Sequence, residues 1–477
     1  MLTLGLVIEA LTGYQAAGGP QIITDAAIDS RLSIPGSLFV ALPGERTDGH
    51  YFVSAAFARG AIAALVQQDM PADFKSLDLR EPLTFEQAAN MPLPICLRVD
   101  DTLKAMQSLA ARWRNRLDVR VIGVTGSVGK TTSKELIAAV LSTRYRTFKT
   151  EGNYNNEIGL PLMLLKLTEA HERAVLELGF YEVGEIALLC EWARPHVGVV
   201  NNVYAVHLER AGSIENIIQG KGELIEALPP APDGAAVLNF DDPRVMQMQS
   251  RLRGARLFTY GLDPQADVWA DRIESRGLQG VYFNLHHRGE TLHVRIPMLG
   301  QHSVHTALRA AAVGLIEGLT WQEIVEGLQS IGAVQLRLAA VKGPGGSLIL
   351  DDTYNASPES TIAALNLLSE MEAKRRVAVL GDMLELGSYE ETGHRMVGQR
   401  ARDVADVLVT VGPRARIIAR EARRAGLPAH AITEVDTGEQ ALELLRRMIG
   451  ADDVVLLKGS RGLRMDRIVR ALGEGAG

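Results

Sequence analysis

The chain has 477 residues, of which 47% are hydrophobic, and a formal net charge of −7 at neutral pH. This length accommodates roughly three domains, each with its own core. The acidic balance and the scattered lysines and arginines argue against a nucleic-acid-binding or membrane-surface protein. Cys96 and Cys190 lie far apart without metal-ligand spacing, so we predict neither a disulfide nor a zinc site and expect both thiols to be buried.

The first part of the chain reads as a small α/β domain. Residues 20–70 hold short apolar runs separated by turn signals such as Pro35-Gly36 and Asp48-Gly49. Polar, proline-marked sequence over residues 69–94 predicts a surface segment that leads to a domain boundary near residue 100. No stretch reaches the roughly 18 uncharged apolar residues of a membrane span, and no basic segment precedes an apolar core at the N-terminus. We therefore expect a cytoplasmic protein without membrane insertion.

The remaining elements predict two larger α/β domains. The helical segment TLKAMQSLAARWRNRL precedes the strand VRVIGVT, and the apolar runs AVLEL, VGVVNNV and AAVLNF follow with helical segments between them. This alternation predicts a mostly parallel sheet with helices on both faces, and residues 266–297 predict antiparallel strands at its edge. From Gln335 onward, SLILDD, RVAVLGD, VLVTVG and VVLLKGS predict a Rossmann-like domain. The expected domains are residues 1–100, 101–333 and 334–477.

A glycine-rich loop between a strand and a helix is the most informative motif. In VIGVTGSVGKTT, residues 121–132, an apolar run breaks at the glycines and helical periodicity begins at the lysine. Such loops aim backbone N–H groups at phosphates, while the lysine neutralises charge and a hydroxyl reaches Mg²⁺. Val124 stands where the strict motif has its first glycine, so the loop is a variant. The residues expected to hold the nucleotide are Gly126, Ser127, Val128, Gly129, Lys130, Thr131 and Thr132.

Other polar residues in the central part have two interpretations each. Glu177 ends the strand AVLEL, where a carboxylate either holds Mg²⁺ or faces solvent. The loop EGNYNNEIG crowds three asparagine amides together, which suits either a polyanionic ligand or turn formation. On their own, His207 and Lys221 are more often surface or satisfied residues than ligands.

In the last part of the chain, polar residues follow three predicted strands. Asp351 and Asp352 end the run SLILDD, Tyr354 and Asn355 follow it, and Pro358 starts the next helix. Asp382 and residues 458–461 occupy equivalent strand ends. Ligands of open α/β sheets bind at the carboxyl ends of the strands, so these three ends predict a shared site.

Together these segments resemble the Mur ligases, the ATP-dependent amide-bond-forming ligases of bacterial cell-wall synthesis. The resemblance covers almost the whole chain. Its motifs are DSRLSIPGSLFVALPGERTDGHYF in the first domain, then TGSVGKTT, NYNNEIGLP, VNNVYAVHLE and KGE, and finally DDTYNASP, LGDMLELG and KGSRG. It implies that the first domain holds the UDP end of the substrate near Ser30 and Arg31, the central one is the ATPase, and the third closes over the site and binds the amine substrate.

The resemblance also implies a set of site residues. Lys130, Glu177, His207 and Lys221 would be catalytic, and one or two Mg²⁺ ions would be bound by Thr131, Glu177, His207 and Lys221, the lysine as a carbamate. Further nucleotide contacts would come from Asn155, His302, Arg337, Asp351 and Asn355, and substrate contacts from Asn153, Asn156, Tyr354, Lys458 and Arg461. Several positions depart from the family pattern: Ser303 and Thr306 replace asparagines, Phe180 and Tyr181 follow ELG, and VQLR at residues 334–337, which ends in Arg337, replaces Pro-Gly-Arg.

The implied reaction joins D-Ala-D-Ala to UDP-MurNAc-tripeptide through an acyl phosphate. A sister ligase that adds a single amino acid, including a folylpolyglutamate synthase, is the neighbouring alternative. The missing Asp-Asn-Pro-Arg turn and the pair DDTYNASP and GDMLELG favour the dipeptide. A nucleotide-binding scaffold that no longer ligates should have lost residues of the loop or of the metal site, and no such loss is found. A GTPase should carry the motif Asn-Lys-x-Asp, which this sequence lacks. A monomer with small-molecule partners is expected, and lysine and diaminopimelate both stay open as the third peptide residue.

Overall fold

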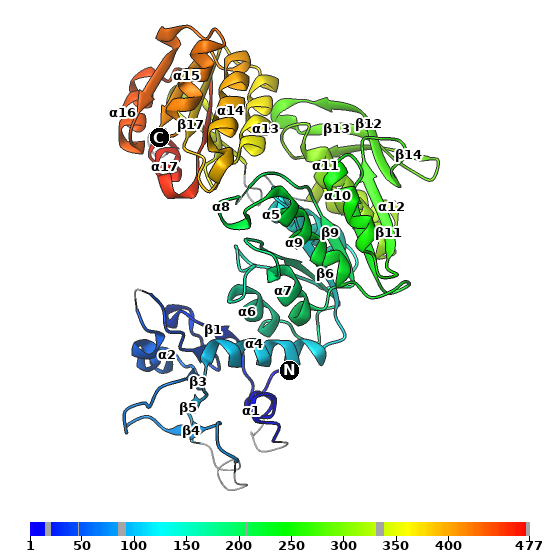
Figure 1. Ribbon diagram of the computed structural model, residues 1–477, viewed down its shortest axis with the longest axis vertical. Helices are drawn as coiled ribbons and strands as arrows, with labels where there is room; N and C mark the ends of the chain where they lie inside the picture. Colours follow the sequence, from blue (N-terminus) through cyan, green and yellow to red (C-terminus); the bar gives the residue numbers. More distant parts are fainter. Residues whose placement is uncertain (15–20, 46, 84–91, 207, 331–337, 474–477) are drawn as a thin grey trace. The chain divides into compact units, whose positions relative to one another are not determined.

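The computed structural model describes residues 1–14, 21–45, 47–83, 92–206, 208–330 and 338–473 (Figure 1). The chain forms two compact units. The first contains Met1–Gly123, Tyr145–Phe180 and Gly184–His196, and the second contains Val124–Arg144, Tyr181–Val183 and Val197–Gly477. The three-domain division stays a prediction, and its boundary at residue 334 lies outside the described residues. None of the helices in the described ranges combines the length and apolarity needed to cross a bilayer.

The N-terminal part of the first unit is the predicted α/β structure. After α1 (Leu4–Thr12), a parallel sheet has the order β1-β2-β3-β5-β4, and α2 (Val53–Ala58) follows β2 in the chain. The strands are β1 (Ala26–Ala27), β2 (Leu38–Val40), β3 (Ala63–Val66), β4 (Ser76–Asp78) and β5 (Ile95–Arg98). Strand β4 lies inside the segment predicted to be irregular surface. It has three residues, of which only Leu77 is buried, so its pattern is too short to detect.

The rest of the first unit packs around a long helix. Helix α4 (Thr102–Asn115) is capped by the Asp101 side chain, which accepts the Lys104 N–H, and it packs against α6 (Gly159–Leu165) and α7 (Glu185–Ala193). Strand β7 (Thr147–Lys149) pairs in parallel with β8 (Arg173–Glu177). Strand β6 (Arg120–Thr125) enters the second unit at Val124. Cys96 and Cys190 are both free and buried, as predicted.

The second unit contains the phosphate loop and the strands from β9 onward. Strands β9, β10, β11 and the start of β12 are parallel, whereas β12, β13 and β14 are antiparallel, which confirms the prediction for residues 266–297. Helix α5 packs against α11 and α12, and a Cβ on Gly327 would lie 2.4 Å from Val140 Cα, so only glycine permits this approach. The bounds are α5 (Lys130–Ser142), β9 (Val197–Val200), α8 (Leu208–Ala211), α9 (Ile214–Glu226), β10 (Ala235–Asn239), α10 (Pro243–Met246), β11 (Arg256–Gly261), β12 (Val268–Ser275), β13 (Val281–His287), β14 (Glu290–Ile296), α11 (Ser303–Ile316) and α12 (Trp321–Ser330).

The C-terminal part of the second unit is a doubly wound sheet. Its order is β15-β16-β20-β17-β18-β19, with β15 alone antiparallel to its neighbour among the described strands. Alternate strand residues face two separate cores, one completed by α13, α14 and α15 and the other by α16 and α17. The bounds are β15 (Ala339–Lys342), β16 (Leu348–Asp352), α13 (Pro358–Glu370), β17 (Arg375–Gly381), α14 (Glu390–Val404), β18 (Val407–Val411), α15 (Arg416–Arg424), β19 (Ile432–Val435), α16 (Gly438–Met448), β20 (Asp453–Lys458) and α17 (Asp466–Gly473).

A buried histidine anchors the loop after β17. His394 Nε2 accepts the Met383 N–H at 3.2 Å, and its Nδ1 donates to the Glu390 carbonyl at 2.8 Å. The bond that Nε2 accepts requires the neutral ring, with its proton on Nδ1. Burial lowers the pKa of His394 below its ordinary 6.5.

We expect the free energy of unfolding to decrease as the pH falls from about 6.5 toward the lowered folded-state pKa of His394. In this range the unfolded chain binds a proton that the folded chain does not, so protonation favours unfolding by up to about 1.4 kcal/mol per pH unit. Urea unfolding midpoints at several pH values, compared between the parent and His394→Gln, test this. The variant should depend less on pH, and an equal dependence in both proteins would refute the assignment.

Candidate functional site

The glycine-rich loop folds as a phosphate-binding loop between β6 and α5. Gly126 and Gly129 have φ of 151° and 78°, values that favour glycine, and a Cβ on Gly126 would stand 2.6 Å from Asn201 Cβ. Lys130 Nζ donates to the Gly126 carbonyl at 2.9 Å, so the lysine folds back across the loop. The loop thus ends at the N-terminus of α5, where the positive end of the helix dipole favours an anion.

The segment after β9 supports this loop. Asn202 Oδ1 accepts the Val128 N–H at 2.8 Å, and Asn201 Nδ2 donates to the Val128 carbonyl at 3.2 Å. The Ser127 hydroxyl donates to the Tyr204 carbonyl at 3.1 Å and accepts the Tyr204 N–H at 2.9 Å. The motif VNNVY contains Asn201 and Asn202, but neither asparagine was predicted to have a role in the site. Two amides directly after a buried strand were the available signal.

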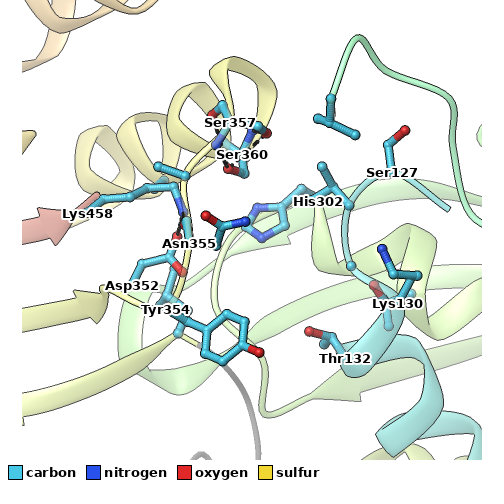
Figure 2. A pocket seen from close by; sticks show the side chains of 18 of the residues that line it. Ser127, Lys130, Thr132, His302, Asp352, Tyr354, Asn355, Ser357, Ser360 and Lys458 are labelled. Carbon is cyan, nitrogen blue, oxygen red and sulfur yellow. Dashed lines mark hydrogen bonds and ion pairs between the residues drawn. The ribbon is translucent and has the colours of Figure 1, made fainter. Parts of the chain in front are cut away.

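A cavity of about 210 Å³ gathers many of the predicted residues (Figure 2). His302 lies between the loop residues Ser127 and Lys130 on one side and Asn355 and Lys458 on the other. Leu299, Leu338 and Ala364 add an apolar lining, so the cavity suits a ligand with an apolar ring and a charged end. The predicted residues that line it are Ser127, Val128, Gly129, Lys130, Thr132, His302, Tyr354, Asn355 and Lys458.

Two of the positions that depart from the family pattern lie in the same cavity. Ser303 and Thr306 both line it, and the Ser303 hydroxyl donates to the Gly300 carbonyl at 2.7 Å. Burial, with smaller contributions from His305 and Lys458, lowers the pKa of His302 to about 4. The His302 imidazole, which lines the cavity, is therefore neutral near pH 7 and has one donor and one acceptor nitrogen.

The ends of β16, β20 and β17 meet at one sheet edge, as predicted, but they have different roles. Lys458 Nζ donates to Asp352 Oδ2 at 2.6 Å and to the Asn355 carbonyl at 2.9 Å, which fixes the segment after β16. Asp351 Oδ1 accepts the N–H and hydroxyl of Thr353. Asp382 is buried and its Oδ1 accepts the Ala415 N–H at 2.7 Å, so this carboxylate anchors α15.

A second cavity, of about 580 Å³, lies beside Tyr354 and has a basic lining. The Arg461 guanidinium stands 5.7 Å from the centre of the Tyr354 ring. Arg461 was predicted from the sequence, but the arginines that follow it at intervals of three in RGLRMDRIVR were not. This regular spacing was the signal that could have identified them as lining one site. The lining consists of Asp351, Thr353, Tyr354, Arg461, Arg464, Asp466, Arg467 and Arg470.

In the first unit, the asparagine-rich loop contacts the predicted metal-binding carboxylate. Asn155 Nδ2 donates to Glu177 Oε1 at 2.8 Å, and the Glu177 side chain is buried. Asn156 Oδ1 accepts the Gly159 N–H at 2.9 Å and so caps α6. Asn156 therefore takes part in turn formation and Asn155 orients a carboxylate, while binding of a polyanionic ligand by this loop stays a prediction. Near the N-terminus, Arg31 pairs with Asp29 at 2.6 Å.

Lys221 is a fully buried lysine on α9. Its exposed fraction is 1%, and burial together with repulsion by Lys130 lowers its pKa well below the ordinary value. This environment favours the neutral amine, which is the form that reacts with CO₂ to give a carbamate. The predicted residues His207 and Arg337 lie outside the described residues. Within the described part of the chain, no three His, Cys, Asp or Glu side chains gather closely enough to hold a metal ion.

Family models match three successive parts of the chain. Residues 23–114 match the "Mur ligase family, catalytic domain", residues 124–314 the "Mur ligase middle domain", and residues 336–461 the "Mur ligase, glutamate ligase domain". UDP-N-acetylmuramoyl-tripeptide--D-alanyl-D-alanine ligase of Bacillus subtilis is 36% identical over 95% of this chain and 94% of its own length. The enzyme of the same name from Escherichia coli is 35% identical over 99% and 98%.

Solved structures agree with these relatives. MurF from Acinetobacter baumannii superposes with a TM-score of 0.82 at 30% identity, with 98% of both chains covered. MurF ligase from Thermotoga maritima in complex with ADP gives a TM-score of 0.78 at 27% identity, again over 98% of both chains. Matches of this length and identity show that the chain belongs to the Mur ligase family.

Proposed function

We propose that this chain joins D-Ala-D-Ala to UDP-N-acetylmuramoyl-tripeptide at the expense of ATP, in peptidoglycan synthesis. The supporting observation is the cavity in which the phosphate loop with Lys130 faces His302, Asn355 and Lys458. A nucleotide with its phosphates on the loop and its ring against the apolar lining fits this arrangement. Relatives that bear this activity in their names match over nearly their whole length.

The proposed reaction has two steps. A carboxylate oxygen of the tripeptide attacks the γ-phosphorus of ATP, and the bond between this phosphorus and the β–γ bridging oxygen breaks. ADP departs, and the tripeptide now carries an acyl phosphate. The amine of D-Ala-D-Ala then attacks the acyl carbon, loses a proton and expels inorganic phosphate. A carboxylate is a poor electrophile, and phosphorylation supplies the leaving group that amide formation needs.

The chain's own residues stabilise charge and orient the reactants in these steps. Lys130 and the N–H groups of the loop neutralise the transferring phosphoryl group. Mg²⁺, when bound, supplies further neutralisation, and we assign Thr131, Glu177, His207 and Lys221 as its ligands, with Lys221 as a carbamate. The buried Glu177, oriented by Asn155, and the buried Lys221, which favours the neutral amine, are consistent with this donor set.

Arg461 is proposed to bind the carboxylate of the incoming dipeptide. The basic cavity shares Tyr354 with the nucleotide cavity, so a dipeptide held there is next to the proposed reaction centre. We expect Arg461→Met to raise the KM for D-Ala-D-Ala about 10-fold to 100-fold, because a charge-assisted bidentate contact is lost, while the KM for ATP changes little. Steady-state kinetics measure this.

The dipeptide amide and a surface variant serve as controls for Arg461. D-Ala-D-alaninamide lacks the carboxylate, so Arg461→Met should affect its KM far less than that of D-Ala-D-Ala. Arg402→Met, which removes an exposed arginine of α14 paired with Asp403, should behave as the parent. Equal effects on dipeptide and amide would remove Arg461 from the proposed site.

Substrate choice is the direct test of the proposed function. Phosphate release from ATP is measured with UDP-MurNAc-tripeptide and either D-Ala-D-Ala or single amino acids, and the products are weighed by mass spectrometry. We expect turnover that requires the dipeptide and adds its mass. Turnover with a single amino acid alone would assign the chain to a sister ligase, and no turnover with any amine would favour a non-ligating scaffold.

A further inference from the structure

A buried arginine lies directly beside the phosphate loop. Arg309, on α11, is 4% exposed, and its Nη1 donates to the Ser133 hydroxyl at 2.5 Å while its Nε donates to the Tyr260 hydroxyl at 3.1 Å. Ser133 in turn donates to the Gly129 carbonyl at 2.8 Å. Arg309 Nη1 is 3.9 Å from the point where a Cβ on Gly129 would stand. The Ser133 hydroxyl therefore links the Arg309 guanidinium to the backbone of the loop.

This charge has no ion-pair partner within the described ranges. The nearby carboxylates have other partners: Asp241 Oδ2 pairs with His305 Nε2 at 2.7 Å, and Asp242 Oδ2 accepts the Val203 N–H at 2.9 Å. The two groups that Arg309 contacts are neutral hydroxyls. Burying a guanidinium without a counter-charge costs free energy, because the group loses its hydration and gains no ion pair in return.

We infer that Arg309 is a positioning residue for the phosphate loop and that the bound polyphosphate supplies its counter-charge. Through Ser133 it fixes Gly129, the residue that precedes Lys130, and its charge adds to those of Lys130 and the α5 N-terminus. The inference rests on the proposed nucleotide site. It explains why a cation is buried at a place where a neutral side chain could also have packed.

The alternative is a purely structural arginine that ties α11 to α5 and β11. The two roles differ in what they predict for ligands with and without phosphates. A structural defect would weaken every ligand of the cavity, or none. Loss of a counter-charge weakens only the ligands that carry phosphate.

The test compares the Kd of Mg·ADP with that of adenosine by titration calorimetry on the full-length protein. We expect Arg309→Met to weaken ADP about 10-fold and adenosine less than about 2-fold. Arg309→Gln keeps a donor for Ser133 without the charge and should weaken ADP to the same extent. Arg309→Lys keeps the charge and should bind ADP within about 3-fold of the parent.

A second buried arginine provides the matched control. Arg114 is also 4% exposed, and its guanidinium donates to the carbonyls of Ala193, Leu117 and Val119. Arg114→Met should lower the unfolding midpoint while leaving the Kd of ADP unchanged. If Arg309→Met does not fold, the Gln and Lys variants decide by the same comparison.

The outcomes separate this inference from the function on which it rests. Equal losses for ADP and adenosine, or no loss in Arg309→Gln, would overturn the role of Arg309. Lys130→Met tests the nucleotide site itself in the same assay. If Lys130→Met weakens ADP and the Arg309 variants do not, only the inference about Arg309 fails. If Lys130→Met also leaves ADP unaffected, the proposed site fails as well.

Discussion

Replacement of Lys130 by methionine is expected to lower the rate of ATP-dependent ligation at least about 1,000-fold. The ammonium group is the charge that the loop brings to the transferring phosphoryl group, and methionine keeps the length of the side chain without the charge. Lys130 Nζ donates to the Gly126 carbonyl at 2.9 Å, so the group lies close to the loop. Phosphate release at saturating substrates measures the effect.

The control for Lys130 is a lysine outside the proposed machinery. Lys104 of α4 has a side chain that is 82% exposed, and Lys104→Met should retain the activity of the parent. Circular dichroism and the unfolding midpoint should be the same for both variants. More than about a tenth of parental activity in Lys130→Met would contradict its assignment to phosphoryl transfer.

Replacement of Lys221 by alanine is the second change with a large expected effect, a loss of about 1,000-fold in activity. The lysine is fully buried, its neutral form is favoured, and the amine nitrogen can attack CO₂ and lose a proton to become a carbamate. The carbamate presents carboxylate-like oxygens to a hard cation such as Mg²⁺. Alanine removes both the amine and the added group.

Two readouts distinguish the carbamate from a lysine that only packs. Acetate or formate should partly restore activity to Lys221→Ala, because a small carboxylate fits the space left by the side chain. Protein equilibrated with ¹³C-bicarbonate should show a carbamate ¹³C resonance that Lys221→Ala lacks. Full activity in the variant, or a parent without this resonance that is nevertheless active, would contradict the proposed role of Lys221.

The sequence predicted the loop and several of its distant partners because their signals are local. The glycines around Lys130 and the polar residues at the ends of VVLLKGS and SLILDD stand at strand ends, and such ends converge in a parallel sheet. The supports of the loop were missed. Asn202 contacts Val128 from 74 positions away, and Arg309 reaches Ser133 from 176 positions away. No spacing rule connects such residues before the fold is known.

The sequence also does not predict which partner a side chain at a strand end will contact. Asp351 and Asp352 end β16 and Asp382 follows β17, yet Asp352 pairs with Lys458, Asp351 closes a turn at Thr353, and Asp382 anchors α15. Strand-end position predicts proximity to a site and not a role within it. For the fold, long apolar runs identified the strands reliably, whereas the short β4, with one buried residue, was missed.

An acyl-phosphate intermediate requires one oxygen atom to pass from the tripeptide carboxylate to the released phosphate. UDP-MurNAc-tripeptide labelled with ¹⁸O in its reacting carboxylate is turned over with ATP and D-Ala-D-Ala, and the released phosphate is analysed by mass spectrometry. We expect one ¹⁸O atom in each phosphate, because the carboxylate oxygen that attacks phosphorus departs with it. Unlabelled phosphate accompanying labelled amide product would contradict the proposed mechanism.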